Sequence, residues 1–227
     1  MKREEMDNKK MDGTNDTHID YDGEIVKLTP RGFWSDFDNL YVIDNPGHGS
    51  CLFYSVVQGI YPQFIQGYDD SLEFVINQEK YIQHLREDMA DDLPRKSNHD
   101  IDDSLSWYDI LLGGNIRDKS KDIPNLTLEN LQEKLRNGST PDIESEVFIE
   151  LMSKMFNVDI YIIDDNSMDL VILDEDIYYE GRLSIILYLK YEHYRLVIHR
   201  NDRDHYALNF ESSHPLIEKM KLRLKKK

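Results

Sequence analysis

The residue in this sequence that is best placed to do chemistry is Cys51, the only cysteine in 227 residues. It lies in the stretch DNPGHGSCLFYSVVQ, Asp44 to Gln58, where a glycine- and proline-containing loop gives way to an apolar run. This pattern places the thiol in the first turn of a predicted helix, where unpaired N–H groups and the helix dipole stabilise a thiolate. The same N–H groups can bind the oxyanion of an acyl-transfer intermediate. A nucleophile fits this position, and so does a buried cysteine that packs as a small hydrophobe.

A thiol nucleophile needs an imidazole to accept its proton, and two of the eight histidines are candidates for this base. His193 lies between two apolar segments with the character of strands, where its side chain can be held rigidly. His205 follows a polar, turn-like segment at 201–204 and is the rival. Each is followed by a tyrosine. We favour His193 because of its strand context.

The elements that must position these residues fall into two groups along the chain. Apolar spacing and capping signals predict helices over 51–59, 72–93, 128–135 and 143–155. Alternating apolar residues predict strands over 40–43, 158–162, 170–173, 183–189 and 194–199. Helices followed by clustered strands favour an α+β fold, with a central twisted β-sheet flanked by helices.

Composition and charge narrow the class of protein further. The net charge is −17, and such an acidic body repels phosphate backbones, so we expect no nucleic-acid partner. Residues 1–35 are predicted to form a disordered polar arm, 36–212 the folded domain and 213–227 a basic C-terminal tail. No apolar run approaches the ~20 residues of a membrane span, and a lone cysteine suits a reducing compartment. We therefore expect a soluble, intracellular, cytoplasmic protein, with nuclear import open through the basic tail.

No cluster of histidines and cysteines has the spacing of metal ligands, and no glycine pattern is typical of a phosphate site. We therefore expect no metal and no cofactor.

The segment PGHGSCLFYSV resembles the cysteine box of the ovarian-tumour (OTU) family of deubiquitinating cysteine proteases. That box typically has Asp-Gly-Asn/Ser-Cys before two apolar or aromatic residues, and Gly49, Ser50 and Cys51 match it together with the Leu-Phe that follows. Two further marks of the family follow in the expected order. The segment TPDIESEVFIELMSKMFNVDIYIID (140–164) is similar to the family's helix with an acidic start that leads into a strand. The segment LSIILYLKYEHYRLVI (183–198) is similar to its hydrophobic strand followed by a His-Tyr pair. The box is also similar to those of large DNA viruses, which would place the protein in a host cell.

This resemblance implies a papain-like OTU domain over 36–212, in which Cys51 is the nucleophile and His193 the base. His48, Gly49 and Ser50 would form the oxyanion loop. His48 stands where the family box has aspartate, and it could equally be an exposed loop residue.

The second departure concerns the group that orients the imidazole. The family often places an acid or amide two residues after the histidine, but here that residue is Arg195, which cannot accept a hydrogen bond. The candidates for the missing acceptor are Asp36, Asp38, Asp44 and Asn209.

Two functions follow from the resemblance. The first is a thiol isopeptidase that removes ubiquitin, or a ubiquitin-like modifier, from lysines, and that a non-standard third catalytic position could weaken. The alternative is a catalytically silent OTU-like module that binds ubiquitin or another protein. Arg195 and His48 favour this alternative. The resemblance leaves linkage preference and oligomeric state undetermined.

Overall fold

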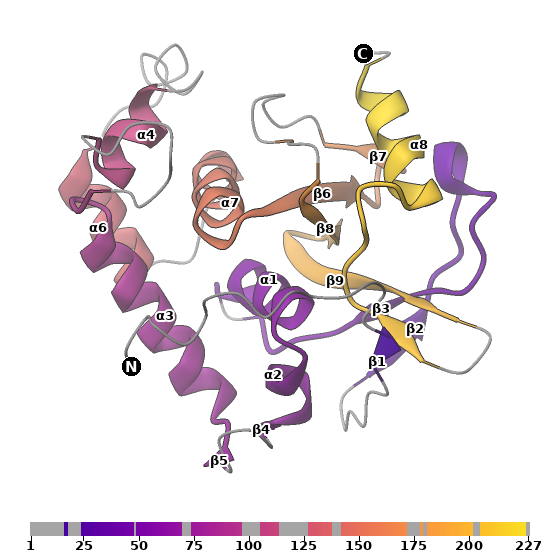
Figure 1. Ribbon diagram of the computed structural model, residues 1–227, viewed down its shortest axis with the longest axis horizontal. Helices are drawn as coiled ribbons and strands as arrows, with labels where there is room; N and C mark the ends of the chain where they lie inside the picture. Colours follow the sequence, from indigo (N-terminus) through magenta and orange to yellow (C-terminus); the bar gives the residue numbers. More distant parts are fainter. Residues whose placement is uncertain are drawn as a thin grey trace.

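The computed structural model describes residues 16–17, 24–47, 49–69, 74–96, 105–113, 127–137, 142–171, 178, 181–201 and 205–225 (Figure 1). Its helical elements are η2 (Gly32–Trp34), α1 (Cys51–Ile60), α2 (Pro62–Gln66), α3 (Gln78–Asp92), α4 (Trp107–Gly113), α6 (Leu128–Asn137), α7 (Asp142–Phe156) and α8 (Pro215–Leu224). Its strands are β1 (Asp16–Thr17), β2 (Ile25–Lys27), β3 (Leu40–Ile43), β4 (Tyr68–Asp69), β5 (Phe74–Val75), β6 (Val158–Asp164), β7 (Asp169–Leu170), β8 (Leu183–Lys190), β9 (His193–Arg200) and β10 (Tyr206–Ala207).

One mixed sheet forms the centre of the molecule. Its strands follow the order β1-β10-β9-β8-β6-β7, and β3 pairs with both β2 and β9. Strands β6 and β8 run parallel, whereas β9 is antiparallel to β8 and to β3. The predicted α+β class, with a central sheet and flanking helices, is confirmed.

The sheet is covered on both faces, and the alternation along β6 shows how. Val158, Ile160 and Ile162 belong to the apolar cluster that includes α1, α3 and α7, whereas Tyr161 and Ile163 belong to the cluster beneath α8. Successive side chains of a strand point to opposite faces, so both faces need an apolar cover. Figure 1 shows α7 and α1 beside the sheet, the long α3 beyond them, and α8 at the opposite side near the C-terminus.

The boundary predicted after residue 35 is wrong. Strand β2 pairs with β3, and Trp34 in η2 is only 1% exposed. Both lie within the segment that was expected to be a disordered arm. The indole of Trp34 fills the cluster on the second face of the sheet, which would otherwise lose a large apolar contact.

The boundary predicted after residue 212 is also wrong. Helix α8 buries Leu216, Ile217 and Met220 completely against the second face of the sheet. Its lysines and arginine had suggested a solvated tail, but in an amphipathic helix those residues occupy one face while the other enters the core. The C-terminal segment through α8 is therefore part of the folded domain.

Candidate active site

Cys51 is the first residue of α1, and its side chain is buried, at 7% exposure. Helix α1 packs on β8 and β9, and its first turn contains no acidic residue. Ser50 occupies the N-cap position without making a side-chain cap, because its hydroxyl instead accepts a 2.5 Å hydrogen bond from Arg86 Nη1. The first turn of α1 therefore keeps N–H groups that can face an oxyanion beside the sulfur.

The loop before Cys51 is fixed by Asn45. Its amide nitrogen donates to the carbonyl of Tyr194 at 2.9 Å and to the hydroxyl of Ser55 at 3.0 Å, and its oxygen accepts from the Gly47 amide at 3.2 Å. The Ser55 hydroxyl, on α1, donates to the same Tyr194 carbonyl at 3.0 Å. These bonds tie the loop and α1 to β9 at the residue that follows His193.

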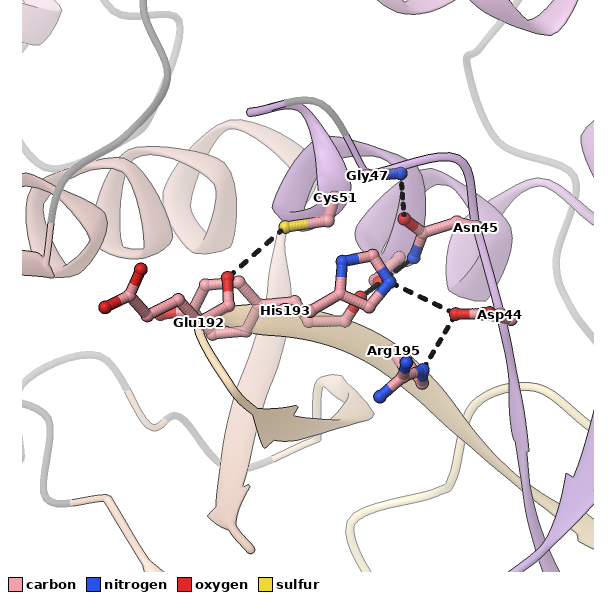
Figure 2. A network of polar contacts seen from close by, with 9 residues as sticks. Asp44, Asn45, Gly47, Cys51, Glu192, His193 and Arg195 are labelled. Carbon is pink, nitrogen blue, oxygen red and sulfur yellow. Dashed lines mark hydrogen bonds and ion pairs between the residues drawn. The ribbon is translucent and has the colours of Figure 1, made fainter.

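Gly47 lies directly against the imidazole of His193. Its φ is +70°, and a Cβ at this position would stand 3.3 Å from His193 Cε1 and 3.4 Å from Nδ1. Only glycine allows both this backbone conformation and this approach. The Nδ1 edge of the ring therefore faces the loop that carries Cys51, as Figure 2 also shows.

The other ring nitrogen of His193 lies 3.1 Å from Asp44 Oδ1, and the same oxygen accepts a 2.7 Å hydrogen bond from Arg195 Nε (Figure 2). The three side chains are partly buried, with exposed fractions of 22% for His193, 38% for Asp44 and 24% for Arg195. Cys51 lies on the opposite side of the ring from Asp44, so the imidazole stands between thiol and carboxylate.

The register of the sheet explains why Asp44 reaches this position. Ile43, at the end of β3, pairs with Leu196 on β9. Continuing that antiparallel register by one residue brings Asp44 opposite Arg195. His193 and Arg195 are two residues apart on one strand, so both side chains point to the same face and meet the carboxylate.

The pKa of each acidic group shows how the site is charged. Burial raises the pKa of the Cys51 thiol above its ordinary value and outweighs the backbone hydrogen bonds and the charge of Arg195 that lower it. Burial also opposes ionisation of Asp44, but hydrogen bonds from Arg195 and His193 outweigh it and hold the pKa of this carboxyl below its ordinary range. At neutral pH the site therefore pairs a protonated thiol with an ionised carboxylate.

This charge state fixes the role of each imidazole nitrogen. An ionised carboxylate only accepts hydrogen bonds, so the proton shared with Asp44 belongs to His193 Nε2. In the neutral form of the ring, Nδ1 is then the acceptor, on the side of Cys51. Such an arrangement can take a proton from the thiol and stabilise the imidazolium that results.

Most of the other predicted residues lie away from His193. His205 is in the connection between β9 and β10, where its backbone bonds with Asn201, at the far end of β9 from His193. Asn209 donates to the Gly59 carbonyl at 2.8 Å, and Asp36 pairs with Lys219 at 2.5 Å. Gly49 lies in the loop with φ +78°. His48 lies outside the described residues. Of the four candidates for the acceptor, the structure brings Asp44 to His193.

Sequence reasoning missed Asn45, Arg86 and the part played by Arg195. Arg195 had counted against an oriented imidazole, but it donates to the carboxylate that contacts His193. A polar residue directly after Asp44, in the same quoted stretch, was the available signal for Asn45. Arg86 gave no local signal, since it contacts Ser50 from the middle of α3.

Within the described ranges, no three side chains of the His, Cys, Asp and Glu types gather as a metal site would require. Within the same ranges, no helix combines the length and apolarity needed to cross a membrane.

A scan of protein-family models finds no match to the sequence, and a search of curated proteins finds none either. Among solved structures, the fold is similar to that of an ovarian tumour (OTU) domain in complex with ubiquitin. The TM-score is 0.48 and the sequence identity 16%, over 82% of this chain and 83% of that one.

Proposed function

We propose that this chain is an OTU-like thiol isopeptidase that removes ubiquitin, or a ubiquitin-like modifier, from lysine side chains. The observation that carries the proposal is the hydrogen bond from His193 to Asp44, which holds an imidazole beside a cysteine at the start of a helix. The choice of modifier rests on the resemblance of the cysteine box and the His-Tyr pair to OTU proteases.

In the first step the Sγ–H proton passes to Nδ1 of His193, and the sulfur attacks the carbonyl carbon of the modifier's C-terminal glycine. The backbone amides of Gly49 and Cys51 stabilise the oxyanion, whereas the Ser50 amide, also expected in the oxyanion loop, donates to the Gly47 carbonyl at 3.1 Å. The imidazolium is stabilised by a charge-assisted hydrogen bond from its other nitrogen to the Asp44 carboxylate. Because burial raises the pKa of the thiol, ionisation depends on this base rather than on a thiolate present beforehand.

The C–N bond then breaks, and the departing lysine amine takes the proton from the imidazolium. A thioester between Cys51 and the modifier remains. Water, deprotonated by the same imidazole, attacks this thioester and releases the modifier's carboxylate, and the thiol regains its proton.

A silent ubiquitin-binding module is the alternative, and the burial of the Cys51 thiol with its raised pKa is the observation in its favour. Arg195 no longer favours this alternative. It donates to Asp44, the carboxylate that contacts the imidazole, so its presence does not mean that the imidazole lacks an acceptor.

The test is reaction with ubiquitin that carries a C-terminal electrophile, followed by mass shift on the intact protein. We expect slow covalent labelling of the wild-type chain and none of Cys51→Ala, since the chain has no other thiol. His193→Ala should slow labelling by about 10²-fold or more, the usual contribution of a general base. Binding of ubiquitin without labelling would favour the silent module. Absence of both, with ubiquitin and with the probes of ubiquitin-like modifiers, would overturn the two functions together.

A further inference from the structure

The turn that precedes His193 presents an aromatic ring to solvent at the edge of the candidate active site. Tyr191 and Glu192 connect β8 to β9, and Lys190 pairs with His193 across the base of the turn. Tyr191 is 82% exposed, the highest value among the large hydrophobic residues of the described ranges. The Glu192 carbonyl lies 4.0 Å from Cys51 Sγ, so the turn borders the thiol directly.

The backbone of this turn is unfavourable for the residues that occupy it. Tyr191 has φ +51° and Glu192 has φ +59°. Two-residue hairpin turns of this kind favour Asn-Gly, because a bulky side chain at positive φ is strained. An exposed aromatic ring gains nothing from the core that would offset this strain. Strained residues of this kind gather at functional sites.

The position of the turn indicates which part of a substrate it faces. The leaving lysine amine must lie at the imidazole, because it receives its proton there. Figure 2 shows the Glu192 carbonyl to the lower left of the Cys51 sulfur and the imidazole to its lower right. The acyl side of the scissile bond, which belongs to the modifier, therefore lies toward the turn.

We infer that Tyr191 is a specificity-determining residue whose ring packs on the C-terminal tail of the modifier as that tail enters the site. This inference rests on the proposed function and specifies how its substrate is held. Tyrosine suits the role, since a rigid amphipathic ring supplies contact area at low cost in conformational entropy. Lys190, whose ammonium lies 5.6 Å from the centre of the Tyr191 ring, steadies the ring on the side of β8.

The experiment compares wild type with Tyr191→Asn and Tyr191→Phe. Asparagine tolerates positive φ, so Tyr191→Asn should raise the melting temperature while it removes the ring. We expect its second-order labelling rate with the ubiquitin electrophile to fall about tenfold, a loss typical of an interface aromatic. Tyr191→Phe should keep the wild-type rate. Val75→Asn, which changes another exposed apolar residue, at 77% exposure in β5, should leave the rate unchanged.

Alkylation of Cys51 by iodoacetamide serves as the readout that needs no modifier, and we expect it to be equal in all these variants. A Tyr191→Asn rate equal to wild type with the ubiquitin probe would overturn the inference alone. So would a loss confined to cleavage of an isopeptide-linked lysine peptide, because the ring would then serve the leaving side. A parallel loss of iodoacetamide reactivity and thermal stability would assign Tyr191 a structural role. If neither ubiquitin nor the probes of ubiquitin-like modifiers label even the wild type, while iodoacetamide reacts, the proposed function itself fails.

Discussion

Replacement of Asp44 by asparagine removes one negative charge from the site while it keeps an oxygen acceptor of the same shape. At 3.1 Å, the distance from Asp44 Oδ1 to His193 Nε2, a full charge pair is worth about 5 kcal/mol at an effective dielectric constant of 20 and about 1.3 kcal/mol in bulk water. The pair is partly exposed and Arg195 already neutralises part of the carboxylate, so we take a loss of about 2–3 kcal/mol for the imidazolium. That corresponds to a rate about 30- to 150-fold lower.

The assay for Asp44→Asn is the concentration dependence of labelling by the ubiquitin electrophile. The maximal rate should fall and the half-saturating concentration should stay unchanged, because Asp44 acts on the imidazole rather than on ubiquitin. Asp38→Asn is the matched control: it makes the same chemical change at an exposed position shortly before β3, and it should react like wild type. An Asp44→Asn rate within twofold of wild type, in a folded protein, would refute the orienting role of this carboxylate.

Three further results are expected. The rate of Cys51 alkylation in the free protein should rise with pH, with a midpoint above the ordinary thiol pKa of about 8.5. The reason is that the thiolate is the reacting form and burial raises the pKa of this thiol. A rate that has already reached its plateau at pH 7 would contradict this. Gly47→Ala should slow ubiquitin labelling at least tenfold (about 1.4 kcal/mol) by displacing the imidazole. Gly67→Ala is the control: at φ +68° with open space around it, it should lose comparable stability but no reactivity. Equal labelling rates in the two variants would contradict the proposed contact of Gly47 with His193. Arg86→Met should lower the free energy of unfolding by about 2–4 kcal/mol in urea titrations, because two carbonyls at the end of α6 lose a buried donor. Arg95→Met, at an exposed position, is the control and should cost less than about 1 kcal/mol. Similar losses in both variants would show that the hydrogen bonds of Arg86 add little stability.

Local signals in the sequence were sufficient for several elements. Glycines before an apolar run located the start of α1 at Cys51, and alternation of apolar residues located β6, β8 and β9. The helix predicted from residue 128 is α6, and Thr127 just before it caps it, because its hydroxyl accepts from the Asn130 amide at 3.3 Å. These elements depend on residues close in sequence, and for that reason a pattern of a few residues predicts them.

The predicted helix over 72–93 shows where such patterns fail. It begins only at Gln78, because the side chain of Asn77 caps it by accepting from the Lys80 amide at 3.0 Å. The preceding Phe74–Val75 instead pairs with Tyr68–Asp69 as β5. The apolar residues before the cap matched the helical spacing, but the capping bond and the strand pairing decided the boundary.

The sequence by itself determined the candidate nucleophile, the preferred base and the α+β class, because each depends on local context around Cys51 and His193 or on periodicity. It left four residues open as partners of the imidazole and treated Arg195 as evidence against an oriented ring. Only the antiparallel pairing of β3 with β9 decided that Asp44 is the partner, since register between strands about 150 residues apart follows from the packing of the whole sheet. The same packing brought Trp34 and α8 into the core, because both faces of the sheet had to be covered.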